Sequence, residues 1–210
     1  MADFYIERRI AKKGFGNIAG IDEAGRGALF GPVVAAAVMF PSSYIRKKLH
    51  GWLKDVNDSK LLSVKKRRKL YPLILKQAIS VGVGMATNHE IDQNNILWAS
   101  KEAMKRAVGD MAEEPDFLLV DGLELYNVNY LQEKVFKGDQ KSITIASASI
   151  VAKVVRDYMI IKLSRKFHGY SLERNKGYGT REHYLALEKL GPTVFHRTSF
   201  SLKCEVKKNG

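Results

Sequence analysis

Residues 17–40 read NIAGIDEAGRGALFGPVVAAAVMF. The first part, Asn17–Glu23, predicts a β-strand that ends on two adjacent acids, and Gly25 then breaks the strand. The last part, Pro32–Phe40, is rich in valine and alanine and predicts a second strand. A sheet therefore begins near the N-terminus, and an acidic pair lies at the end of its first strand.

Strands and helices alternate along the rest of the chain. Phe117–Val120 is a continuous apolar run after Pro115, which is typical of a strand covered on both faces. Interleaved strands and helices predict one three-layer α/β domain over residues 1–210, with its core at about 17–167 and a C-terminal helical part at about 168–210. The other expected strands are Val81–Ala86 and Lys134–Lys137, and the expected helices are Lys65–Ala78, Asn94–Val108, Ser142–Phe167 and Thr180–Leu190.

The chain is strongly basic. Its 35 lysines and arginines exceed its 22 aspartates and glutamates by 13. Such a surplus attracts polyanions, because neutralising phosphates releases their counterions. The richest basic run, Lys65–Lys69, either contacts phosphate or forms an ordinary solvated helix face. Charge alone leaves two readings open, a nucleic-acid-binding protein and a basic but otherwise ordinary surface.

Several classes of protein are not expected. No window approaches the roughly 18 consecutive apolar residues that a membrane-spanning helix needs, and Met1–Lys13 lacks the apolar core of a signal peptide. Cys204 is the single cysteine, so an internal disulfide and a cysteine-rich zinc site are excluded. The phosphate-binding motif Gly-x-x-x-x-Gly-Lys-Ser/Thr is also absent from the sequence. We expect a cytoplasmic protein with no membrane partner.

Acidic residues end three of the expected strands: Asp22 with Glu23, then Asp121, then Asp139. Functional sites of open α/β sheets gather outside the carboxyl ends of the strands, so these four carboxylates would converge if the three strands are parallel neighbours. Such a cluster is unfavourable without a cation, and all-oxygen ligands favour Mg²⁺ or Mn²⁺ over zinc. The alternative is that each strand-end aspartate merely starts a turn.

The acidic pair carries a geometric condition. Successive side chains of a strand point to opposite faces, so Asp22 and Glu23 share one site only if the strand ends or bulges there, which Gly25 favours. Gly25, Arg26 and Gly27 follow, and two glycines let the backbone approach a ligand while the guanidinium meets a phosphate. An ordinary turn would explain the same residues. Beside a carboxylate pair, they suggest a phosphodiester held over a metal.

Further short motifs follow in order along the chain to residue 200. After GIDEAGRG at 20–27 and GPVVAA at 31–36, they are NDSK at 57–60, VDG at 120–122, KGD at 137–139, ASIVAK at 148–153 with Arg156 and Asp157, KGYGT at 176–180 and HRTSF at 196–200. Together they closely resemble the ribonuclease HII family, the type 2 ribonucleases H.

This resemblance implies a ribonuclease H-like mixed sheet flanked by helices, with a C-terminal helical portion. It implies an enzyme that cleaves the RNA strand of RNA–DNA hybrids and nicks duplex DNA at embedded ribonucleotides. Without the resemblance, Tyr178 would be interpreted as a half-buried surface tyrosine, and NDSK as an ordinary turn before the basic helix. The family's catalytic and metal-binding acids would be Asp22, Glu23, Asp121 and Asp139, its junction-reading residues Gly25, Arg26, Gly27 and Tyr178, and its phosphate contacts Asn57 and Lys60.

Mechanism and partners follow from the same resemblance. Two divalent cations bridged by Asp22 would support in-line attack by water and leave a 3′-hydroxyl and a 5′-phosphate. Asp157 matches a family position, but it lies four residues after Lys153 in an expected helix, so we expect a structural ion pair. Arg26 separates the chain from ribonuclease HIII, which usually lacks that arginine. We expect a monomer that binds RNA–DNA hybrids and ribonucleotide-containing duplex DNA. A non-catalytic binding module would explain the charge but not the acids.

Overall fold

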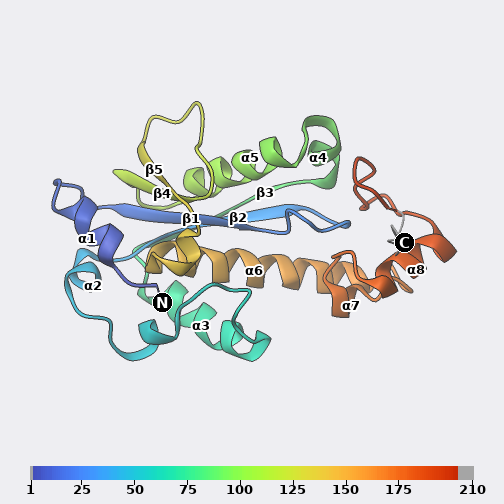
Figure 1. Cartoon of the computed structure of the whole chain (residues 1–210), viewed down its shortest axis with the longest axis horizontal. Coiled ribbons are helices and arrows are strands. Elements are labelled where there is room, and N and C mark those ends of the chain that lie inside the picture. The colour runs from blue at the N-terminus through green and yellow to red at the C-terminus, as the bar shows by residue number, and fades with distance from the viewer. Residues whose placement is uncertain (1, 203–210) are drawn as a thin grey trace, which may run out of the picture.

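One five-stranded mixed sheet, in the order β3-β2-β1-β4-β5, lies at the centre of the computed structural model, which describes residues 2–202 (Figure 1). β1 is antiparallel to β2 and parallel to β4, β2 is antiparallel to β3, and β4 is parallel to β5. β1, β4 and β5 are therefore parallel neighbours, as the convergence of the acids requires. The strands are β1 (Ile18–Ala24), β2 (Val33–Met39), β3 (Ser80–Ala86), β4 (Phe117–Asp121) and β5 (Leu131–Val135).

Helices cover both faces of this sheet. α6 (Ile143–Ser164) and α3 (Val64–Gln77) lie on one side of it, and α5 (Ile96–Gly109) lies on the other (Figure 1). Every residue of β2 is buried, and so are the first four residues of β4. Neither segment therefore has a face open to water. Glycine allows the closest approach, since a Cβ on Gly20 would lie 2.3 Å from the backbone nitrogen of Ile145. The predicted α/β fold, a mixed sheet flanked by helices, is confirmed.

The N-terminal segment holds the start of α6. Glu7 of α1 (Tyr5–Ala11) is buried and accepts hydrogen bonds from the Ser142 hydroxyl at 2.7 Å and from the Thr144 backbone N–H at 3.0 Å. The first N–H groups of a helix have no partner within the helix, so this carboxylate satisfies one of them. Burial raises the pKa of Glu7. Two short elements, α2 (Ser42–Arg46) and the 3-10 helix η1 (Gly51–Asp55), then connect β2 to α3.

The helix predicted at Asn94–Val108 is confirmed, since α5 covers Ile96–Gly109, and a second helix that was not predicted lies just before it. α4 (Asn88–Asn94) ends at Asn95, whose φ of 71° lies in the left-handed region, and α5 begins at the next residue. The side chain of Asn95 accepts hydrogen bonds from the backbone N–H groups of Leu97 and Trp98. Asn95 therefore ends one helix and caps the other.

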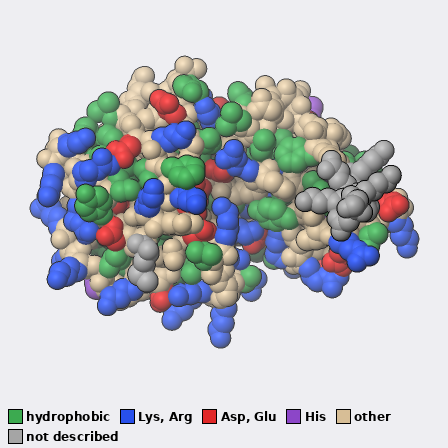
Figure 2. Space-filling view, in the orientation of Figure 1, with side chains coloured by type: hydrophobic (Ala, Val, Ile, Leu, Met, Phe, Trp, Pro, Cys, Tyr) green, Lys and Arg blue, Asp and Glu red, His purple; other side chains and the backbone are tan. Residues whose placement is uncertain are grey.

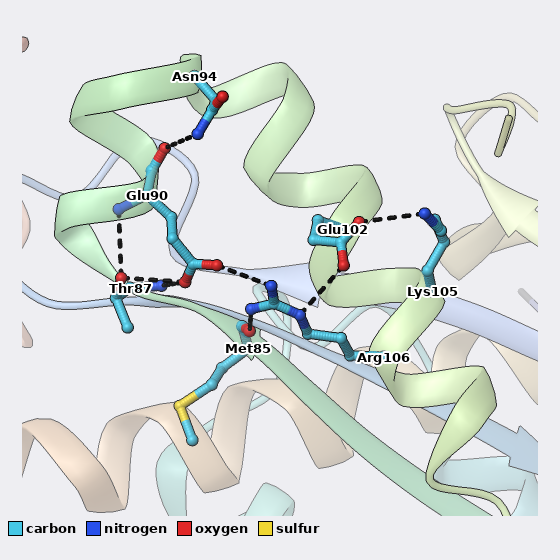
Figure 3. Close-up of polar contacts among 7 residues, drawn as sticks. All are labelled: Met85, Thr87, Glu90, Asn94, Glu102, Lys105 and Arg106. Carbon is cyan, nitrogen blue, oxygen red and sulfur yellow. Dashed lines mark hydrogen bonds and ion pairs between the residues drawn. The ribbon is translucent and has the colours of Figure 1, made fainter. Parts of the chain in front are cut away.

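Arg106 of α5 ties this helix pair to the sheet. Its guanidinium donates to Glu90 of α4 at 2.7 Å, to Glu102 of α5 at 3.2 Å and to the carbonyl of Met85 in β3 at 2.8 Å (Figure 3). The hydrogen bond from Arg106 lowers the pKa of Glu90 to about 2. The network fixes α4 and α5 over β3, and it includes none of the predicted site residues.

The C-terminal helical part sits at the far end of α6 and contains α7 (Leu172–Asn175) and α8 (Arg181–Leu190) (Figure 1). Two isolated β-bridges, Ala28 with Tyr178 and Phe30 with His196, join it to the loop between β1 and β2. The buried guanidinium of Arg156 donates to the carbonyls of Phe30, Pro32 and Lys176. The loop that follows the acidic pair is therefore fastened to the C-terminal part.

The expected strand at Lys134–Lys137 needs correction. β5 ends at Val135, paired with the last residue of β4, and the chain then turns through Lys137, whose φ is 52°. Asp139 does not end a strand but lies in a short 3-10 helix, η2 (Gly138–Gln140), just before α6. Cys204 lies outside the described residues. Across residues 2–202, every helix is too short or too polar to cross a membrane.

Candidate active site

A pocket of about 480 Å³ opens where β4 stops pairing with β1. The last β1–β4 pair is Ile21 with Val120, whereas β1 stays in register with β2 to the end of the strand. Among residues 2–202, Asp22 and Glu23 have no strand partner on the β4 side, and both side chains line the pocket together with Asp121. The strand neither bulges nor ends at the pair, since β1 pairs with β2 as far as Ala24; the pairing that ends is the one with β4, and this opens the pocket to both side chains.

Asp22 and Glu23 are acids held in unfavourable surroundings. Asp22 is 4% exposed, and burial, with the charges of Glu23 and Asp121, raises its pKa well above the ordinary value. Burial also raises the pKa of Glu23, although the neighbouring Arg26 opposes the shift. Within residues 2–202, Oε2 of Glu23 is buried and has no hydrogen-bond partner. A buried carboxylate oxygen without a donor is suited to a cation.

Asp121 and Asp139 lie on neighbouring segments. Oδ1 of Asp121 accepts a hydrogen bond of 2.6 Å from the backbone N–H of Gly138, which holds the Asp139 segment against the end of β4. Burial raises the pKa of Asp121. Burial, together with the charges of Asp58 and Asp121, raises the pKa of Asp139 to about 6. Asp58 is itself buried, so a fifth acid adjoins the predicted four.

These acids suit a hard divalent cation. Their donor atoms are all oxygens, their pKa values are raised, and one of their oxygens lacks a partner. Within the described part of the chain, however, no three acidic, histidine or cysteine side chains lie close enough to form a ready-made metal cage.

The charge of Lys60 acts on Glu23, Asp121 and Asp139. This lysine lines the pocket, and although burial lowers its pKa, the carboxylates around it, with Asp22 the strongest, raise the pKa overall. Asn57 lies in the same turn, but its Oδ1 accepts from the backbone N–H of Asp58 at 2.9 Å, and Asn57 is not among the described residues that line the pocket. The structure brings Lys60, rather than Asn57, to the acids.

The loop of Gly25, Arg26 and Gly27 forms another wall of the pocket. Gly25 has a φ of 98°, and a Cβ there would lie 2.0 Å from Nε of Arg156, so the loop requires glycine at this position. Nη1 of Arg26 lies 3.4 Å from Oε1 of Glu23, and the Arg26 side chain is 45% exposed. A Cβ on Gly27 would meet nothing within 4 Å, so this residue borders open space.

The same loop is held from behind by Arg197. The buried guanidinium donates to the Arg26 carbonyl at 2.8 Å. In a planar trans peptide the carbonyl and the next N–H point in opposite directions. The N–H of Gly27 therefore points away from Arg197, and Gly27 lines the pocket. The loop is suited to donate a backbone hydrogen bond to a bound ligand.

Tyr178 closes the pocket from the C-terminal part. Its ring has Nζ of Lys153 4.8 Å from its centroid and the guanidinium carbon of Arg156 at 5.2 Å, an arrangement that orients an aromatic ring. Its carbonyl lies 3.0 Å from Nδ1 of His183. The predicted ion pair of Asp157 is confirmed, with Nζ of Lys153 at 2.8 Å.

Comparison with known proteins shows the family. A model described as Ribonuclease HII matches residues 19–203. The chain belongs to the ribonuclease HII family. It is 48% identical over 199 residues to the ribonuclease HII of Syntrophus aciditrophicus, a match that covers 95% of this chain and 91% of that one.

Solved structures show the same ribonuclease H fold. The ribonuclease H2 of Pyrococcus horikoshii OT3 has a TM-score of 0.72 and 25% identity, over 89% of this chain and 94% of that chain. The Bst ribonuclease HIII in complex with Mn²⁺ has a TM-score of 0.64 and 19% identity, over 92% of this chain and 70% of that chain. As a ribonuclease HII, the protein is a type 2 ribonuclease H, a hydrolase of a divalent-metal-dependent family that acts on RNA–DNA hybrids.

Sequence reasoning missed three residues of this ribonuclease HII site. Asp58 borders Asp139, while Lys153 and Arg156 lie at the Tyr178 ring. Asp58 belongs to the NDSK motif at 57–60. Its position between two proposed phosphate contacts, Asn57 and Lys60, was the sequence signal that could have indicated it. Lys153 and Arg156 are three residues apart on one helix, and that spacing places them on one face. Nothing local in the sequence indicates that this face meets Tyr178.

Proposed function

We propose that the protein, besides acting on RNA–DNA hybrids, nicks duplex DNA at a single embedded ribonucleotide and leaves a 3′-hydroxyl and a 5′-phosphate. The observation that supports this most is that the Gly27 backbone and Tyr178 line the same pocket as Asp22, Glu23 and Asp121. A 2′-hydroxyl distinguishes RNA from DNA at a site, and one such group is enough for a backbone donor and a tyrosine to recognise.

The four acids Asp22, Glu23, Asp121 and Asp139 would hold the divalent cations, which are Mg²⁺ or Mn²⁺. Two cations bound there would activate water and stabilise the leaving 3′-oxygen. Lys60, with Asn57 in the same turn, would contact a phosphate next to the scissile one. Arg26 would exchange part of its contact with Glu23 for the substrate phosphate.

Junction reading would fall to the loop and to Tyr178. Gly25 and Gly27 bring the backbone near the ribose, and the N–H of Gly27 would donate to the 2′-oxygen. The Tyr178 ring, oriented by Lys153 and Arg156, would stack on the adjoining deoxyribose. The buried Arg156 donates to carbonyls of both the loop region and Lys176, so the two reading elements would keep a fixed spacing.

The whole chain, residues 1–210, would act as one catalytic domain and as a monomer. The β-bridges between the β1–β2 loop and residues 178 and 196 support this, because the C-terminal part supplies a wall of the pocket. A single cysteine and no disulfide suit the cytoplasm, where the proposed substrates arise.

The test is cleavage of a DNA duplex that contains one ribonucleotide, compared with an all-DNA duplex and a full RNA–DNA hybrid. With Mg²⁺ or Mn²⁺ we expect one nick at the ribonucleotide, with end groups mapped to a 3′-hydroxyl and a 5′-phosphate, and no cut in the all-DNA duplex. Asp121→Asn should abolish cleavage and retain binding. Cleavage of the hybrid alone would refute the nicking activity, and cleavage in EDTA would refute the metal site.

A further inference from the structure

A second groove, of about 230 Å³, lies between α3, α6 and α7. Arg68 lines it from α3, Asp157 and Tyr158 from α6, and Glu173 and Lys176 from α7 and its C-terminal end. Figure 2 shows Lys and Arg side chains along the lower edge of the molecule, over α3 and toward α7. The basic run that the sequence analysis left without a role therefore contributes to a defined concave surface.

The acids of this groove are already paired with other cations. Asp157 binds Nζ of Lys153 at 2.8 Å, and Glu173 lies 3.9 Å from Nε of Arg174. Lys176 contacts the carbonyl oxygen of Glu173 through Nζ, and the charges of Asp157 and Glu173 also act on it. Three cations, Arg67, Arg68 and Lys176, nevertheless face these two acids in the groove, so positive charge remains.

The cations also crowd one another. Burial lowers the pKa of Lys176, and the like charges of Lys153 and Arg68 add to the shift, although Asp157 and Glu173 oppose it. Three separate elements therefore bring positive charge close together. α3, which is 14 residues long, also starts at the groove with Val64, and its N-terminus adds partial positive charge. An anion bound between Arg68 and Lys176 would relieve this repulsion.

The groove adjoins the active-site pocket. Lys153 lines the pocket and its ion-pair partner Asp157 lines the groove. The groove residues of α6 run from Val154 to Ile161, which is about 1.5–12 Å beyond Lys153 along the helix axis at about 1.5 Å per residue. One strand of a duplex carries a phosphate about every 3.4 Å of axis. A duplex in the pocket would reach the groove within about four nucleotides.

We propose that Arg68 and Lys176 bind one backbone phosphate of the duplex, within about four nucleotides of the bond that is cleaved. The ligand is a phosphodiester, recognised by charge and not by base. The proposal rests on the proposed function for its ligand, a nucleic-acid duplex. It extends the substrate contacts from the acidic pocket onto the α3–α7 side of the molecule.

The first test is equilibrium binding of an RNA–DNA hybrid, measured by fluorescence anisotropy in EDTA so that cleavage plays no part. The double variant Arg68→Ala with Lys176→Asn removes both charges, and asparagine tolerates the left-handed φ of 51° at position 176. We expect a Kd increased about 10- to 100-fold and a salt slope smaller by about 0.9, the value for one phosphate. The matched control is Lys69→Ala, the next residue of α3, whose charge acts on Asp55 and is not part of the groove.

The second test leaves the protein unchanged. Single methylphosphonates, which are neutral, are placed in turn at each of the four positions on either side of the ribonucleotide. Wild-type protein should lose affinity when the methylphosphonate occupies one particular position. The double variant, which already lacks the phosphate contact, should lose no further affinity when that position is substituted. A Kd of the double variant within twofold of wild type, or equal additional losses in both proteins, would overturn the proposal. If the double variant binds more weakly but the wild type shows no cleavage, the proposed function is rejected and the phosphate-binding proposal stands.

Discussion

Replacing Asp139 with asparagine should stabilise the metal-free protein at neutral pH. Asp139 is 4% exposed, and burial with the charges of Asp58 and Asp121 raises its pKa from an ordinary 3.8 to about 6. Where folding raises the pKa of an acid, the stability that its neutral form provides is fully present below the pKa of the unfolded chain. This stability is lost as pH rises through the pKa of the folded protein. At pH 7.5 the wild-type fold carries the charge, whereas asparagine is neutral and can still donate to Asp58.

The magnitude follows from the two pKa values. The difference is about 2 units, and each unit corresponds to about 1.36 kcal/mol, so Asp139→Asn should gain on the order of 3 kcal/mol at pH 7.5. For a chain of this size each kcal/mol raises Tm by about 2–4 °C, so we expect a rise of about 6–12 °C. At pH 4 the advantage should fall below about 1 kcal/mol, because Asp139 is then protonated in the wild-type fold.

The assay is thermal unfolding of both proteins in EDTA at pH 7.5 and at pH 4, followed by circular dichroism. The control is Asp55→Asn, the same chemical change at an exposed acid whose pKa is lowered by Lys66, and it should not raise Tm. Asp139→Asn should also abolish cleavage and the stabilisation by Mg²⁺. An unchanged or lower Tm at pH 7.5, or a gain equally large at pH 4, would refute the description of the acidic cluster.

Three more outcomes are expected. Tyr178→Ala should lower kcat/KM on a single embedded ribonucleotide about 10- to 100-fold or more, because it removes one stacking and one hydrogen-bonding contact worth about 1–3 kcal/mol each. Tyr178→Phe should fall between this variant and wild type, and losses on a long hybrid should be smaller; equal losses on both substrates would contradict this. Gly25→Ala should lower the free energy of unfolding by about 1–3 kcal/mol, and Tm with it, because the new Cβ would lie 2.0 Å from Arg156. Gly27→Ala should leave Tm unchanged, because a Cβ there meets nothing within 4 Å. Burial and the neighbouring histidine, His183, lower the pKa of His196 to about 4. The free energy of unfolding of the wild type should therefore fall by on the order of 3 kcal/mol as pH falls from 6.5 to 4, and the urea unfolding midpoint of His196→Asn should lack this pH dependence.

The sequence predicted the sheet well because its strands are marked by strong local signals. The apolar run at Phe117–Val120 and the glycine break after Glu23 each fix a strand end within one residue of β4 and β1. Parallel pairing of β1, β4 and β5 was a condition stated from the acids, and the structure meets it.

The remaining features depend on tertiary contacts. Asp139 was expected at a strand end, but the chain turns at Lys137, and the next residue, Gly138, donates its backbone N–H to Asp121, which is far away in sequence. Asn95 caps α5, and its left-handed backbone conformation, which periodicity cannot reveal, moves the start of the helix from the predicted Asn94 to Ile96. The contact of Arg156 with Tyr178 joins α6 to the C-terminal part, and no sequence pattern encodes such a distance.

The two bridges between the β1–β2 loop and the C-terminal part have a consequence for protein synthesis. Asp22 and Glu23 precede their neighbour Asp121 by about a hundred residues, and they precede Tyr178 and the bridge partner His196 by more than about 150. A growing chain on the ribosome therefore lacks one wall of the pocket until residues 178 and 196 have emerged. A truncated product that ends before Tyr178 would carry the acidic pair without the side chain proposed to recognise a ribonucleotide.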